Sequence, residues 1–405
     1  MIVRLLGAAA AAVAEASAAP SLGAVSDAAG AELQSFSQMV HASLQNLSRY
    51  RDQVHTQWEP QQLQALLEPL TALTAAVLRP FASAECEGAL EGWGADAVLS
   101  CLQSWGVLLP SRGQESYTAW EEAQEQPARV ALDGMVRGAL PAVLSAYLGW
   151  RLGCARGAAG GVLAAKFTRS AKEVDPFSAG DAEDDLLEAA VLLLRCAVPG
   201  SLAMLQSALS ERLALVAAAA EGAGAAAAEA ASLLELAAAV LCDPPRSEVP
   251  LVPWRLHALS AAAGGDGGAD PLVGLLRELS GCCALCTQLV AARGGSVPHA
   301  AALVAAAART AARLAPTYLA LANAPLRAQY RQGVSASLSE ACLPTQEGGL
   351  RSLEGSVALA AACVLGGMGA AAEEAGVEVL DAVSQVGTCS LLASHRTLPC
   401  HDTVL

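Results

Sequence analysis

The chain has 405 residues, of which 54% are hydrophobic and only 4% aromatic, and its formal net charge is −15. This length exceeds one ordinary helical domain, so we expect several domains or one continuous array of repeats. Ala and Leu dominate and alternating Val/Ile runs are missing, which excludes a β-sandwich or a doubly wound sheet. The acidic balance provides no basic face for nucleic acid; it suits either solubility alone or a basic protein partner.

The first 30 residues are expected to be an Ala-rich segment, helical or disordered. Their opening stretch is similar to a signal peptide, because Arg4 precedes an apolar run that ends in small residues. Glu15 interrupts that run, so we favour the helical or disordered alternative. No stretch of the chain has leucine-like hydrophobicity over the roughly 18 residues that a membrane span requires, so we expect no membrane insertion.

Periodic apolar residues predict helices through the first half of the chain. Leu33, Phe36, Val40 and Leu44, for example, fall on one stripe of a 3.6-residue period. Helices are predicted over Glu32–Gln57, Gln61–Leu78, Ala95–Leu109 and Val130–Cys154. Pro69 and Pro141 lie inside two of these segments and predict a bend, a split or a joint.

Further helices are predicted after a connection over residues 155–180. They cover Asp181–Cys196, Leu202–Ala220, Ala225–Leu241, Pro271–Ala292, Pro298–Asn323, Pro325–Cys342 and Arg351–Cys389, several of them opening on the proline that favours a first turn. Two stretches rich in Ala and Gly, Ala217–Ala231 and Ala261–Ala269, are expected to be enlarged loops.

Helix, short break and helix recur at roughly 40 residues, the spacing of paired-helix repeats. The sequence therefore predicts an all-α fold: a HEAT/armadillo-like helical-repeat superhelix, or α-solenoid, over residues 31–389. A short polar tail, residues 390–405, is expected to follow it.

The search for chemistry predicts no enzyme. Cys283 and Cys286 form a CxxC beside Cys282, which alone could be half a zinc site or a redox pair. No second pair lies at useful spacing and no strand precedes it, so we interpret these thiols as buried structural residues. HExxH, GxSxG and phosphate-loop motifs are missing. We therefore expect no catalytic residue, no metal and no cofactor, and the scattered cysteines favour a reducing, cytosolic or nuclear setting.

One acidic cluster is the candidate partner-binding site: Asp181, Glu183, Asp184 and Asp185, at the start of a predicted helix. Acidic side chains there are stabilised by the helix dipole, which explains them without any partner. The same charges would attract basic protein cargo and speed its association. Both interpretations stay open.

A more specific pattern lies over Leu233–Ser260, which reads LLELAAAVLCDPPRSEVPLVPWRLHALS. This helix, acidic-Pro turn, Glu-x-Pro-x-x-Pro run and second helix resemble nuclear export receptors of the exportin-4 type, in the importin-β (karyopherin) superfamily. Other parts are similar in the same order: Trp105 in its helix, Leu193 with Arg195, Leu209 with Glu211 and Arg212, and Thr317-Tyr318-Leu319. The likeness spans residues 90–325.

The resemblance implies the middle portion of a HEAT-repeat receptor that exports protein cargo through nuclear pores under control of the GTPase Ran. It implies no catalysis. The implied partners are protein cargo, Ran where the full receptor is present, and nuclear pore proteins; the acidic charge of the chain favours a cargo with a basic surface. It also implies shuttling between nucleus and cytoplasm. The alternative is a general HEAT-repeat protein-binding scaffold without Ran dependence.

Overall fold

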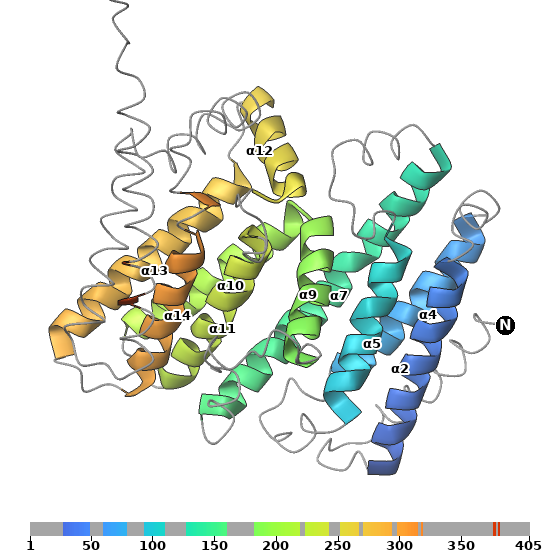
Figure 1. Cartoon of the computed structure of the whole chain (residues 1–405), viewed down its shortest axis with the longest axis horizontal. Helices are drawn as coiled ribbons and strands as arrows, with labels where there is room; N and C mark the ends of the chain where they lie inside the picture. Colours follow the sequence, from blue (N-terminus) through green and yellow to red (C-terminus); the bar gives the residue numbers. More distant parts are fainter. Residues whose placement is uncertain are drawn as a thin grey trace, which may run out of the picture. The chain divides into compact units, whose positions relative to one another are not determined.

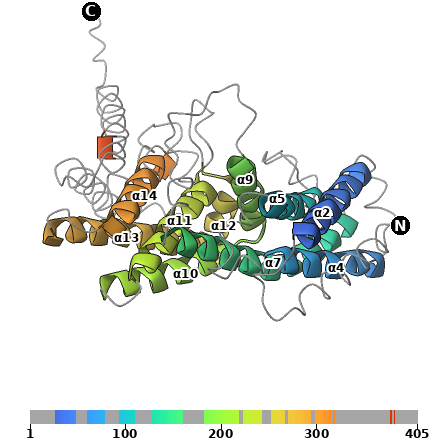
Figure 2. The same ribbon diagram turned by 90° about the horizontal axis from the view of Figure 1, so that it is seen from below.

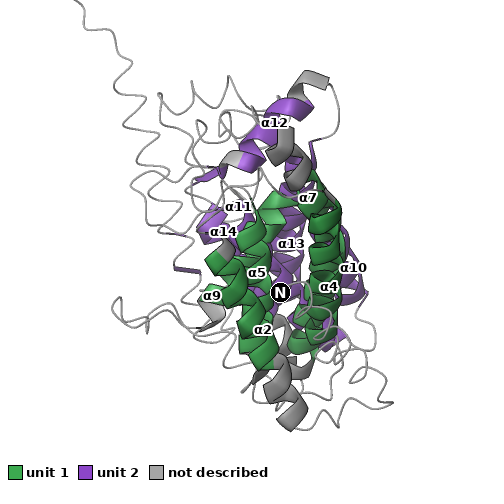
Figure 3. Ribbon diagram, turned by 90° about the vertical axis from the view of Figure 1, so that its right-hand side faces the viewer, with its two compact units in different colours: residues 1–201 green, residues 202–405 purple. Residues whose placement is uncertain are grey.

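A computed structural model of the chain describes residues 27–48, 60–78, 93–109, 127–159, 182–218, 223–242, 252–266, 270–293, 298–314, 317–318, 376–377 and 380. These residues are almost entirely helical and contain no strand, so the predicted all-α class is confirmed for them. The chain divides into two compact units, residues 1–201 and 202–405 (Figure 3).

The helices of the first unit form two rows. They are α2 (Asp27–Ser48), α4 (Pro60–Leu78), α5 (Trp93–Leu108), α7 (Pro127–Ala159) and α9 (Ala182–Cys196). Helix α5 packs against both α2 and α9, and α4 packs against α7. Figure 3 shows α2, α5 and α9 side by side in one row and α4 and α7 in the other. The chain therefore alternates between rows as it runs through this unit.

Apolar side chains at helical spacing explain why these helices pack together. Helix α4 buries Leu63, Leu66, Leu67, Leu70 and Leu73 completely or nearly so, while the other residues between them are exposed or half-buried. Each such leucine contributes about 1.5–3 kcal/mol of transfer free energy when it leaves water. The stripe that the sequence predicted is thus the buried face of α4.

The split expected as one alternative at Pro69 and the joint expected as one alternative at Pro141 are wrong, because each proline lies inside one continuous helix, α4 or α7. The other alternative, a bend at each proline, stays a prediction. A proline inside a helix leaves the carbonyl four residues earlier without its usual amide donor. Pro141 is exposed, so the carbonyl beneath it faces the outer side of α7, where water can satisfy it. The helix therefore tolerates the proline without ending.

The second unit contains α10 (Gly200–Ala217, whose first two residues belong to the first unit), α11 (Ala223–Leu241), α12 (Trp254–Asp266), α13 (Pro271–Arg293) and α14 (Pro298–Leu314). Helix α14 packs against α11 along its length and also against α13 (Figures 1 and 2). Helix α12 contacts α13.

The buried faces of α11 and α14 both contain many alanines, beside larger residues such as Leu233 of α11 and Leu303 of α14. Helix α11 buries Ala226, Ala227, Ala230 and Ala237–Ala239, and α14 buries the run Ala305–Ala308. Small side chains allow two helix backbones to approach closely, and alanine has the highest helix propensity. The loop predicted over Ala217–Ala231 is therefore wrong from Ala223 onward.

The second predicted loop, Ala261–Ala269, is also wrong in its first part, because α12 continues to Asp266. Its three consecutive alanines favour the helix more strongly than the following glycines oppose it over one further turn. The rest of that loop lies outside the described residues.

Several predicted segments fall where the structure gives no description. The connection predicted over residues 155–180 is wrong up to Ala159, where α7 ends, and the rest of it lies outside the described residues. The helix Pro325–Cys342, the tail 390–405 and almost all of Arg351–Cys389 also lie outside them. The N-terminal segment 1–30 is described only from Asp27, where α2 begins. These predictions stay predictions.

Asp270 caps the start of α13. Its Oδ1 accepts the Leu272 amide at 2.9 Å, and its Oδ2 accepts the Ser260 hydroxyl of α12 at 2.5 Å. Asp270 and Ser260 are both buried, and Pro271 occupies the first helical position, where its missing N–H is harmless. One carboxylate thus starts α13 and ties α12 to it.

Asp270→Ala is expected to lower the free energy of unfolding by about 1–2 kcal/mol, because the Leu272 amide and Ser260 hydroxyl both lose their acceptor. Denaturant titration followed by circular dichroism measures this loss. Asp270→Asn is the matched control: it keeps an oxygen for the Leu272 amide and should lose less. Equal losses in the two variants would contradict the cap as the source of the stability.

Candidate functional site

The acidic cluster predicted as a partner site lies at the start of α9, which begins at Ala182. Asp185 is exposed in the first turn of that helix. Asp181 lies outside the described residues, and the side chains of Glu183 and Asp184 are not among those described. The structure therefore places one of the four predicted residues, on the solvent side of α9.

Glu188 extends this acidic face and was missed in the sequence. It is exposed and follows Asp185 by three residues, so both side chains lie on one face of the helix. Between them Leu186 is buried, as are Ala190 and Leu193 further along. The inner face of α9 packs on α5, where the Leu192 side chain lies 3.4 Å from the position of a Cβ on Gly106. Reading α9 at i, i+3 spacing would have found Glu188.

Every cysteine in the described helices is buried, as predicted. Cys282, Cys283 and Cys286 lie in the middle of α13, and two of them are fully covered. Within the described part of the chain, no three His, Cys, Asp or Glu side chains come together in a way that could hold a metal ion. The burial of the CxxC thiols is confirmed, and their position inside a helix agrees with a packing role.

Two buried side-chain hydrogen bonds link three helices of the first unit. The Cys101 thiol of α5 donates to the Ser37 hydroxyl of α2 at 3.6 Å, and the Trp105 indole Nε1 of α5 donates to the Thr74 hydroxyl of α4 at 3.0 Å. Thr74 in turn donates to the Leu70 carbonyl one turn back in α4 at 2.8 Å. Burial raises the pKa of Cys101 from 9.0 to about 11, an effect that its hydrogen bonds with Ser37 and Thr74 partly oppose. This thiol is poorly suited to be a nucleophile.

The raised pKa of Cys101 predicts a pH-dependent stability. The unfolded thiol ionises near pH 9.0 and the folded one near 11, so its contribution is fully present below pH 9 and declines as the pH rises through this interval. The free energy of unfolding, measured by denaturant titration between pH 8 and 11, should fall less steeply in Cys101→Ala than in the unsubstituted chain. Identical slopes would contradict the assignment.

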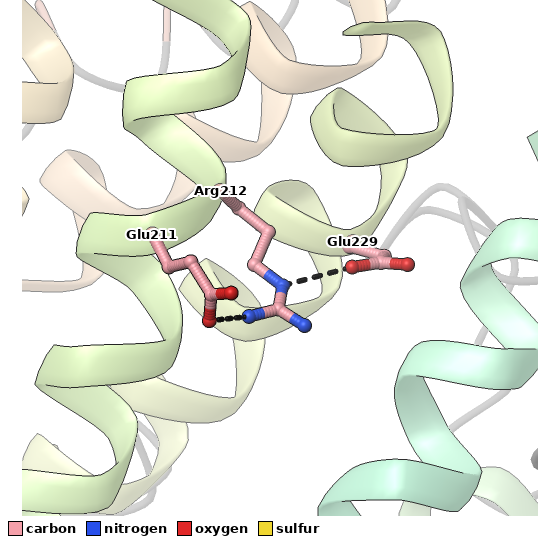
Figure 4. Close-up of polar contacts among 3 residues, drawn as sticks. All are labelled: Glu211, Arg212 and Glu229. Carbon is pink, nitrogen blue, oxygen red and sulfur yellow. Dashed lines mark hydrogen bonds and ion pairs between the residues drawn. The ribbon is translucent and has the colours of Figure 1, made fainter. Parts of the chain in front are cut away.

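Charged pairs anchor α11 on two sides. Glu229 of α11 accepts the Arg212 Nε of α10 at 2.9 Å, and their side chains are only 8% and 18% exposed. Arg212 also pairs with its neighbour Glu211, which is 67% exposed (Figure 4). Further along α11, Glu235 pairs with Arg309 of α14 at 2.9 Å. The pairs orient α11 against both neighbours.

The end of α11 is capped from residues far along the chain. The Tyr318 hydroxyl donates to the Leu241 carbonyl at 2.9 Å, and Arg313 Nη2 donates to the Cys242 carbonyl at 3.4 Å. These carbonyls lie at a helix terminus, where no intrahelical amide reaches them. Buried Tyr318 thus satisfies a polar group that burial would otherwise penalise.

Most of the residues that carry the family resemblance take part in packing or in the contacts described above. Trp105, Leu193, Leu209 and Tyr318 are buried, and Arg212 forms the ion pair with Glu229. Each therefore has a role in packing or helix orientation within its own unit. Glu211, which belongs to the same pattern, is by contrast 67% exposed.

Two helices among the described residues are long and apolar enough to cross a membrane by length and composition: Ala223–Leu241 and Pro271–Val290. Both windows contain charged residues, Glu229 and Glu235 in the first and Arg277 and Glu278 in the second, so neither is the uninterrupted apolar stretch that the sequence was expected to lack. The expectation of no membrane insertion stays a prediction. A third candidate arises only if Asp185–Cys196 and Gly200–Ala217 are counted as one broken span. In the folded chain 67% of the α11 window is covered by protein, and its two glutamates are paired with arginines.

Comparison of the chain with models of known protein families and with curated proteins finds no match in either set.

Proposed function

We propose that this chain is a protein-binding α-solenoid and that it serves as a nuclear transport receptor, or as a portion of one, for basic protein cargo. The observation that supports the solenoid is the alternation of the first unit between two rows, α2, α5 and α9 against α4 and α7 (Figure 3). Helix pairs that stack in this way add binding surface with each repeat. The export role rests on the resemblance over residues 90–325.

The acidic face of α9 supports a basic partner. Asp185 and Glu188 are exposed on one side of the helix, and the chain as a whole carries a net charge of −15. Such a surface attracts a positively charged protein over about one Debye length and raises its association rate. Export through nuclear pores would further place Ran and nuclear pore proteins among the partners, and the chain in both nucleus and cytoplasm.

The test is a binding experiment with the full chain, a basic cargo protein and Ran loaded with GTP or with GDP. A nuclear export receptor should retain the cargo with GTP-loaded Ran and release it with GDP-loaded Ran. Cargo binding that is the same with both forms would overturn the transport role and favour a scaffold without Ran dependence. No binding of basic protein in any condition would overturn both.

Charge reversal on α9 tests the binding surface itself. Glu188→Lys is expected to lower the association rate of a basic protein about 3- to 10-fold at low salt, with the difference disappearing at high salt. Stopped-flow or surface-based kinetics measures it. Glu68→Lys on α4 is the matched control, because Glu68 is exposed too but lies in the other row. An equal loss in both variants would show that only net charge matters.

A further inference from the structure

We draw no further inference here: the strongest candidate, the exposed stripe of small side chains along α7 (Gly134, Gly138, Ala142 and Ser145), rests on small residues alone, and nothing in the described part of the chain shows what covers it.

Discussion

Trp105→Ala is expected to lower the free energy of unfolding of the first unit by about 3–5 kcal/mol, the range for deleting a large buried aromatic side chain. Trp105 is fully buried in α5 and is among the largest buried side chains of the chain. Its removal would leave a cavity between α4 and α5, since its indole Nε1 reaches Thr74 of α4. Denaturant titration followed by circular dichroism measures the change.

Two further variants separate packing from hydrogen bonding at this position. Trp105→Phe keeps an aromatic ring but removes the indole N–H, so it should lose less than Trp105→Ala. Thr74→Val keeps nearly the same shape but removes the acceptor of the buried indole N–H, which should lower the free energy of unfolding by about 1–3 kcal/mol. A loss below 1 kcal/mol in Trp105→Ala would contradict the position of Trp105 in the core.

Arg212→Met is expected to lower the free energy of unfolding of the second unit by about 3 kcal/mol, because the buried Glu229 carboxylate loses its guanidinium partner. Methionine keeps much of the apolar stem of arginine, so the loss reports the charge more than the packing. Denaturant titration measures this change as well.

The two carboxylates beside Arg212 should differ sharply. Glu211→Gln is expected to change the free energy of unfolding by less than about 0.5 kcal/mol, because Glu211 is 67% exposed and its pairing competes with water. Glu229→Gln should cost more than Glu211→Gln and less than Arg212→Met, because the arginine keeps Glu211 as a partner at the solvent edge (Figure 4).

A double-mutant cycle completes this test. Arg212→Met combined with Glu229→Gln should be less destabilising than the sum of the two single changes, because neither charge is then left in the interior without its partner. Additive effects would contradict a direct interaction between Arg212 and Glu229. Equal effects of Glu211→Gln and Glu229→Gln would contradict the difference in burial.

The helices themselves could be predicted well from the sequence. The predicted Gln61–Leu78 and Ala225–Leu241 differ from α4 and α11 by one or two residues. Helix formation depends on local propensity and on the spacing of apolar residues, and both are visible in the sequence. The split at Pro69, the joint at Pro141 and the loop after Ala223 were wrong because composition suggested a break in the helix that packing does not require.

The candidate site could be predicted only in part. The acidic start of α9 was recognised, but which of its charges face solvent depends on how α9 packs against α5. Leu186 faces inward, whereas Asp185 and Glu188 face outward. Glu188 lies beyond the first turn of α9, so a prediction based on acidic residues at the helix start does not include it. The buried state of the α13 thiols was predictable, since they lie in apolar helical sequence.

The sequence by itself thus determined the all-α class, the approximate helix boundaries and the burial of the described cysteines, because each follows from residues within a few turns of one another. Tertiary structure alone decided which helices are partners. Arg309 meets Glu235 across 74 residues and Tyr318 meets the Leu241 carbonyl across 77, and no local pattern encodes such distances. These contacts form because a buried charge or carbonyl must find a partner wherever the packing of the apolar faces places one.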